Sequence, residues 1–153
     1  LPIFDYEKTL IVFFGDHQPA MDDDFLEYCF GKKMEDLTFN EQQMQYLSKF
    51  MIWANYDIPE KENMILSSNY LSSYMLTLTG LSPAPYNNYL NDMRKSVPAM
   101  NAYGYLGKDG VIRKHSGPDS DEKIDQKVEE YKCLIYDELT QGKDRNEEFY
   151  GLP

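Results

Sequence analysis

The chain has 153 residues, the length of one domain, and we expect residues 1–153 to form a single domain. Its net charge of -11 argues against nucleic acid and against an anionic membrane surface as direct partners, because both carry phosphates that repel an acidic protein. Two cysteines, Cys29 and Cys133, lack the spacing of a disulfide framework and are predicted to be buried thiols. No stretch reaches the roughly 18 apolar residues of a membrane span, so the chain itself is expected to be soluble, with any membrane anchor upstream of it.

The most hydrophobic stretch, TLIVFF at residues 9–14, predicts a strand buried on both faces, as in a parallel sheet covered by helices. The strand leads into Gly15, Asp16 and His17. Gly15 allows a turn and a close approach of the backbone, and the next two residues place a carboxylate beside an imidazole where the strand ends. Such ligands suit Mn, Zn or Mg, although a catalytic metal usually takes three or more ligands from the protein. The alternative is that Asp16 caps a helix and His17 is a polar loop residue.

The next segments alternate between helical and strand patterns. Three aspartates at residues 22–24 precede a short apolar patch at 25–30 and predict a helix cap or a solvated loop, since they lack the spacing of an EF-hand loop. Residues 38–50 have helical spacing, and Thr38 with Glu41 forms a capping box at their start. Residues 50–54 predict a second buried strand, in which Trp53 is expected to belong to the core.

Two helices are predicted in the middle of the chain. Residues 66–81 carry apolar side chains at helical spacing, and Gly80 supplies the stop. A proline-rich turn separates them from a second helix at residues 86–96.

The remaining segments predict a hairpin and a last helix. Lys108-Asp109-Gly110 is a hairpin turn signal, and His115, just after it, is expected at the surface. Residues 119–139 form the last predicted helix, with Ser120 as its cap. The order of elements indicates an α/β arrangement with a small antiparallel hairpin appendage.

Four stretches together resemble a known family. In order they are FFGDHQP, WANYD, SSNYLSSYMLTLTGL and EEYKCLIYDELTQG, and they are similar to the carboxyl-terminal part of lipoteichoic acid synthase-like phosphoglycerol transferases. That family belongs to the sulfatase and alkaline phosphatase superfamily. The resemblance covers residues 9–142 and implies the C-terminal portion of an alkaline phosphatase-like layered fold, a fragment of a larger sulfatase-like catalytic domain.

The resemblance also implies a chemistry. The Asp and His of the family's GDH motif bind a divalent cation, commonly manganese, and they correspond to Asp16 and His17 here. The family's acidic ligand and its threonine nucleophile come from earlier in the chain and are not in this sequence, so the isolated chain is expected to be inactive. The implied substrate is a phosphoglycerol lipid, or another phosphodiester or a sulfate ester. The parent protein would lie at the extracytoplasmic face of a bacterial membrane, held there by upstream helices.

Two other interpretations remain open. The chain can be a non-catalytic module that binds a glycan or a protein through its 13 tyrosines, although so many tyrosines favour core and boundary packing. It can also be a self-contained metal hydrolase that uses Asp16, His17 and His115, which requires the hairpin to fold back over the strand end.

Overall fold

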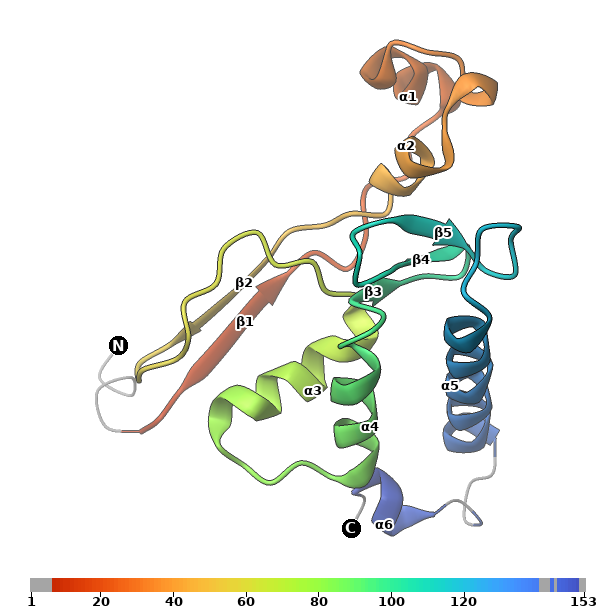
Figure 1. Ribbon diagram of the computed structural model, residues 1–153. Coiled ribbons are helices and arrows are strands. Elements are labelled where there is room, and N and C mark those ends of the chain that lie inside the picture. The colour runs from red at the N-terminus through yellow and green to blue at the C-terminus, as the bar shows by residue number, and fades with distance from the viewer. Residues whose placement is uncertain (1–6, 141–143, 145, 152–153) are drawn as a thin grey trace. The chain divides into compact units, whose positions relative to one another are not determined.

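The computed structural model describes residues 7–140, 144 and 146–151 (Figure 1). The chain divides into two compact units, Leu1–Pro59 and Glu60–Pro153, and each is described by itself. That all 153 residues belong to one larger domain stays a prediction. Among the described residues, none of the helices is both long and apolar enough to cross a bilayer.

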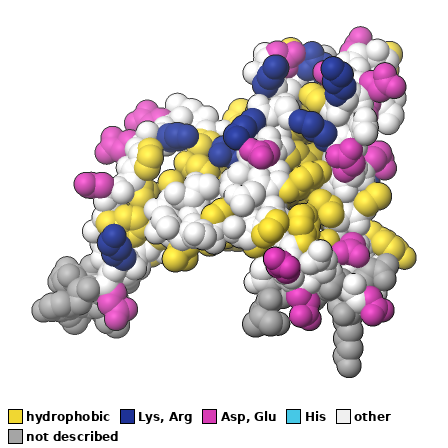
Figure 2. All heavy atoms as spheres, turned by 60° about the horizontal axis from the view of Figure 1, so that its bottom comes forward, with side chains coloured by type: hydrophobic (Ala, Val, Ile, Leu, Met, Phe, Trp, Pro, Cys, Tyr) yellow, Lys and Arg dark blue, Asp and Glu magenta, His cyan; other side chains and the backbone are white. Residues whose placement is uncertain are grey.

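The first unit is built on an antiparallel ribbon of two strands, β1 (Leu10–Phe14) and β2 (Phe50–Ala54). Both strands were predicted. The prediction that the first strand belongs to a parallel sheet buried on both faces was wrong for the described residues. Among the described residues β1 pairs with β2 alone, and Phe13 is 72% exposed. Trp53 is 44% exposed and was wrongly expected in the core. Figure 2 shows apolar side chains at the surface of the molecule.

A helical lobe, residues 16–49, connects the two strands. It contains α1 (Asp23–Phe30), a 3₁₀ turn (Met34–Asp36) and α2 (Phe39–Met44). The predicted caps are confirmed: the Asp22 carboxylate accepts a hydrogen bond from the Phe25 backbone N–H, and Thr38 and Glu41 form the capping box. The helix predicted for residues 38–50 is shorter than expected, because the chain leaves it after Met44 to begin β2.

The second unit packs four helices around tyrosines and aliphatic side chains. They are α3 (Ser68–Thr79), α4 (Pro85–Met93), α5 (Glu122–Thr140) and α6 (Glu147–Tyr150). The core cluster consists of Tyr70, Leu90, Met93, Val128 and Tyr131. Burial raises the pKa of Tyr70, which is wholly removed from solvent. The prediction that tyrosines serve core packing is therefore confirmed for the buried tyrosines of this unit, whereas Tyr103 and Tyr136 are exposed.

Three short strands form an antiparallel meander, β3 (Ala99–Met100), β4 (Gly104–Leu106) and β5 (Ile112–Lys114). The predicted hairpin is confirmed: Gly110 takes a left-handed φ of 78° in the turn, and Arg113 pairs with Asp109 across it. The meander leads to α5. The predicted cap Ser120 was wrong, because Asp121 accepts the hydrogen bond of the Lys123 backbone N–H instead.

The α/β class is thus confirmed, with small antiparallel sheets, whereas the alkaline phosphatase-like layering stays a prediction. The two cysteines correct another expectation. Cys29 and Cys133 are free and exposed, because α1 buries none of its residues and Cys133 lies on the solvent side of α5.

Candidate functional site

The turn after β1 is held by the segment that leads into β2. The Gly15 backbone N–H donates to the Lys49 carbonyl at 3.0 Å, and the Ser48 hydroxyl donates to the Gly15 carbonyl at 2.7 Å. The Gln18 side-chain amide donates to the Leu47 carbonyl. A Cβ on Gly15 would lie 3.1 Å from the Ser48 Cβ, so glycine is needed here for close approach, not for a left-handed backbone.

Asp16 and His17 follow this clamped turn and lie side by side. The His17 backbone N–H donates to Asp16 Oδ1 at 2.9 Å. His17 Nδ1 lies 2.8 Å from the Gln18 carbonyl oxygen, and because a carbonyl only accepts, Nδ1 carries the proton of this hydrogen bond. The other ring nitrogen, Nε2, is 3.4 Å from Asp16 Oδ2. The alternative in which Asp16 caps a helix was wrong, because α1 is capped by Asp22, but its other part is confirmed: His17 is an exposed loop residue.

The geometry of this pair fits a shared metal ion. Two ligand atoms that each lie about 2.1 Å from one cation are roughly 3.0 to 3.4 Å apart when the ligand–metal–ligand angle is between 90° and the tetrahedral value. The observed separation of Nε2 and Oδ2 falls within this range. With its proton on Nδ1, a neutral His17 has its lone pair on Nε2, which is the arrangement expected of a metal-binding histidine. Both side chains are about four-fifths exposed and accessible to an ion.

The pair brings together two candidate ligands. Among the residues that the structure describes, no three His, Cys, Asp or Glu side chains come together to hold a metal ion. His115 lies in the other unit, and its Nε2 forms a hydrogen bond with the Asn101 carbonyl at 2.8 Å. The three-ligand interpretation that adds His115 therefore has no support within either unit.

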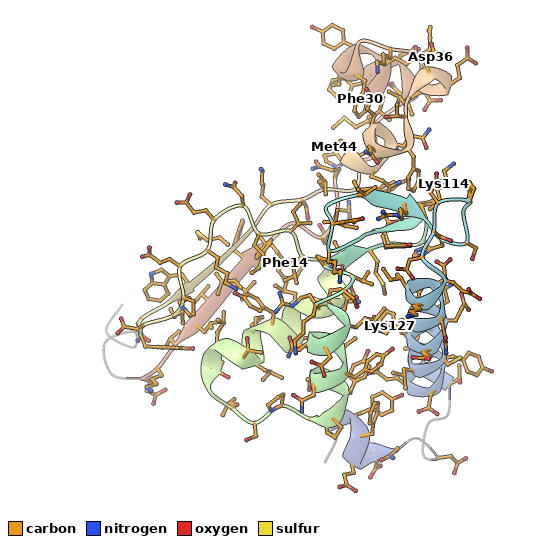
Figure 3. The ribbon with its side chains drawn as sticks, in the orientation of Figure 1. Phe14, Phe30, Asp36, Met44, Lys114 and Lys127 are labelled. Atoms are coloured by element: carbon orange, nitrogen blue, oxygen red, sulfur yellow. The ribbon has the colours of Figure 1, made fainter. Side chains whose placement is uncertain are left out.

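The pair also lines an open pocket of about 520 Å³ inside the lobe. Most of the lining is apolar and comes from α1, from the turn before it and from the end of α2. These apolar side chains are Pro19, Ala20, Met21, Phe25, Leu26, Phe30, Met44 and Tyr46. Phe30 on α1 and Met44 on α2 both belong to this lobe beyond the end of the ribbon (Figure 3). We did not predict the pocket from the sequence, although the spacing of residues 25, 26, 29 and 30 on one helix face signals an apolar wall.

Two ion pairs brace the lobe. Lys32 pairs with Glu41 at 2.6 Å, which links the end of α1 to the start of α2, and Lys33 pairs with Glu27 at 2.6 Å. The hydrogen bond from Lys32, helped by those from Thr38, lowers the pKa of Glu41 to about 2. The lobe is thus fastened by polar contacts at its outer end while its apolar pocket stays open.

No protein-family model and no curated protein matches the chain. Among solved structures, the chain is similar to the Streptococcus pyogenes phosphoglycerol transferase GacH in complex with sn-glycerol-1-phosphate, with a TM-score of 0.59 and 19% sequence identity. The match covers 97% of this chain and 32% of that one, so the chain spans about one third of the length of the protein it matches. The resemblance predicted from the four sequence stretches is therefore confirmed at the level of fold: the chain folds like part of a phosphoglycerol transferase.

Proposed function

We propose that this chain is the metal-binding C-terminal segment of a phosphoglycerol transferase or a related sulfatase-family hydrolase. In this proposal Asp16 and His17 supply two ligands of a divalent cation, most readily Mn²⁺, with Mg²⁺ or Zn²⁺ as the other candidates. In this proposal the nucleophile and the remaining ligands come from residues that are not among these 153, so the chain alone is inactive. The observation that carries the proposal is the paired Nε2 and Oδ2 at the end of β1, in a fold similar to that of GacH.

The chain's own residues prepare the pair for a cation. The hydrogen bond of His17 Nδ1 with the Gln18 carbonyl orients the ring, and Nε2 lies 3.4 Å from Asp16 Oδ2. The bond from Ser48 to Gly15 and the contact of Gln18 with Leu47 hold the turn against the start of β2. Once bound, a divalent cation would neutralise charge on phosphoryl oxygens and lower the pKa of a coordinated hydroxyl.

The substrate class follows from the comparison. GacH was solved with sn-glycerol-1-phosphate, which supports a phosphoglycerol group as the group transferred. Other phosphodiesters and sulfate esters are the alternative substrates of such a site. We place the parent protein at the extracytoplasmic face of a bacterial membrane, which is where the predicted family acts.

The test is a phosphodiesterase and phosphoglycerol transfer assay on the gene product that carries this chain together with any sequence that precedes it. Asp16→Asn and His17→Gln should each abolish Mn²⁺-dependent turnover, since each removes a ligand. Asp57→Asn and His115→Gln are the matched controls and should retain it. Loss of activity in His115→Gln alone would contradict the assignment. A folded wild type that never turns over a phosphodiester or sulfate ester would favour the non-catalytic module.

A further inference from the structure

The turn between β4 and β5 (Figure 1) contains the one aspartate of the sequence that a glycine follows, Asp109-Gly110. In such a step the backbone nitrogen of the glycine can attack the aspartate Cγ, because glycine has no side chain to hinder the approach. A bond forms between nitrogen and Cγ, the Cγ–OH bond breaks, and the hydroxyl leaves with the amide proton as water. The product is a cyclic succinimide. Water then adds back: opening at Cγ restores aspartate, and opening at the α-carbonyl gives isoaspartate.

Both oxygens of the Asp109 side chain are engaged by donors. Arg113 donates from Nη1 to Oδ1 at 3.0 Å and from Nη2 to Oδ2 at 2.6 Å, and the Val111 backbone N–H donates to Oδ1 at 3.2 Å. A two-pronged pair of this kind stabilises the ionised carboxylate and fixes its orientation. The ionised form is the unreactive one, because a carboxylate has no hydroxyl that can leave as water. The pair with Arg113 therefore disfavours the attack on Cγ.

The attacking nitrogen is engaged as well. The Gly110 backbone N–H donates to the Gly107 carbonyl at 3.0 Å, and the Gly107 N–H donates to the Val111 carbonyl at 2.9 Å. These two hydrogen bonds close the turn, in which Gly110 takes the left-handed φ of 78°. The succinimide nitrogen carries no proton, so the reaction has to break the bond from Gly110 to Gly107. The closed turn thus opposes the reaction at the nitrogen, as Arg113 does at the carboxyl group.

We propose that Asp109-Gly110 is a site of spontaneous isoaspartate formation, and that Arg113 suppresses the reaction by holding the Asp109 carboxylate ionised and in place. Isoaspartate has its Cβ in the main chain, so the turn gains one backbone carbon and the hydrogen bonds that close it no longer fit. The new carboxylate is attached to Cα, away from its place opposite Arg113. Isomerisation would therefore open the hairpin of β4 and β5. The proposal is independent of the proposed metal pair, which lies in the other unit.

The test is the rate at which isoaspartate accumulates at residue 109 while the 153-residue chain ages in mildly acidic buffer. Peptide mass spectrometry with electron-transfer fragmentation distinguishes isoaspartate from aspartate, and a synthetic peptide of residues 103–117 gives the rate of the unfolded sequence. The Asp109 pKa of about 2, in place of the ordinary 3.8, leaves roughly 60-fold less of the protonated carboxyl group. We therefore expect the chain to react tens of times more slowly than the peptide, and Arg113→Gln to recover most of this difference.

Gly107→Ala separates the pair without removing a charge. A Cβ at this position would lie 2.6 Å from Asp109 Oδ1 and 2.9 Å from Arg113 Nη1, so both side chains have to shift, and isomerisation should accelerate severalfold. Lys108→Gln is the matched control. It removes one positive charge from the same turn but neither of the Arg113 bonds, so the rate should stay within about twofold of the wild type. Asp119, which precedes a serine in the same unit, is an internal reference whose rate should not change.

Three results would overturn the proposal. The first is a folded wild type that forms isoaspartate as fast as the peptide, and the second is an Arg113→Gln variant with the rate of the wild type. The third comes from Ile112→Ala, which shortens a side chain of β5 and keeps both partners of the pair. An acceleration in this variant as large as that in Arg113→Gln would show that mobility of the hairpin, and not Arg113, controls the rate. Circular dichroism checks that each variant folds, and Gly107→Ala keeps the test valid if Arg113→Gln does not.

Discussion

Substitutions at Gly15 and Ser48 should be energetically coupled, because a Cβ added at position 15 would occupy space next to the Ser48 Cβ, beside the candidate metal ligands. In Gly15→Ala the new Cβ lies 3.1 Å from the Ser48 Cβ, closer than the roughly 3.5 to 4.0 Å of an ordinary carbon contact. We therefore expect the substitution to destabilise the ribbon of β1 and β2, although alanine by itself restricts the unfolded chain more than glycine does.

The expected magnitudes follow from these two effects. In Gly15→Ala, overpacking destabilises the folded state by about 1 to 3 kcal/mol. The lower conformational entropy of the unfolded chain stabilises the variant by about 0.4 to 1 kcal/mol. The net effect is a free energy of unfolding about 1 kcal/mol lower than that of the wild type. Ser48→Gly loses the 2.7 Å hydrogen bond to the Gly15 carbonyl, worth about 0.5 to 1.5 kcal/mol, and gains backbone freedom. It also removes the opposing Cβ, so Gly15→Ala in that background should be neutral or slightly stabilising. The coupling free energy is then about 1.5 kcal/mol.

Urea unfolding of the four proteins of this cycle measures the coupling. Far-UV circular dichroism follows the unfolding, because Trp53, the single tryptophan of the sequence, is 44% exposed in β2 and its emission would change little. Unfolding free energies that add within about 0.3 kcal/mol would refute the steric reasoning. So would a Gly15→Ala variant that is more stable than the wild type.

Three further predictions concern other parts of the chain. Hydrogen bonds from Arg113 hold the pKa of Asp109 at about 2, below its ordinary value of 3.8. The stability that this pair gives the hairpin is therefore lost as the pH falls from 3.8 towards 2. Arg113→Gln should return the pKa of Asp109 to the ordinary range in a carbon NMR titration, and an unchanged pKa would count against the pair. Tyr150→Phe removes a hydroxyl that lies 2.9 Å from both the Leu134 carbonyl and the Asp137 carboxylate of α5 and shares its one proton between them. The substitution should cost about 1 to 2 kcal/mol in urea unfolding followed by circular dichroism, whereas Tyr28→Phe, at an 85% exposed position, should cost nothing measurable. Trp53 should emit like an exposed indole and be quenched readily by acrylamide, and a blue-shifted, protected emission would show that its face is covered.

Local signals in the sequence predicted the elements well because local physics decides them. The capping box of Thr38 and Glu41, the stop at Gly80 and the hairpin around Asp109 each need only neighbouring residues, and all three are present. The pairing of β1 was not predictable in this way. An apolar run such as residues 9–14 indicates burial, but its partner is chosen by segments far away in the sequence, here β2.

The candidate site was predictable in part for the same reason. Asp16 and His17 are adjacent, so their proximity needed no tertiary information, whereas the pocket beside them depends on how α1 and α2 fold back after the turn. Cys29 illustrates the limit. Its thiol was expected in the core because cysteine is usually buried, but α1 lies at the pocket and buries none of its residues. No third candidate ligand joins the pair among the described residues, and the pair alone does not indicate where one would lie.

The most direct test of the metal assignment is proton NMR of the two histidines of this chain during titration with Mn²⁺. A paramagnetic ion broadens the signals of its ligands most strongly, so substoichiometric Mn²⁺ should broaden the imidazole signals of His17 more than those of His115, which is not a ligand in this account. Asp16→Asn should require more Mn²⁺ for the same broadening. Equal broadening of both histidines, or none at His17, would contradict the claim that Asp16 and His17 form a metal-binding pair.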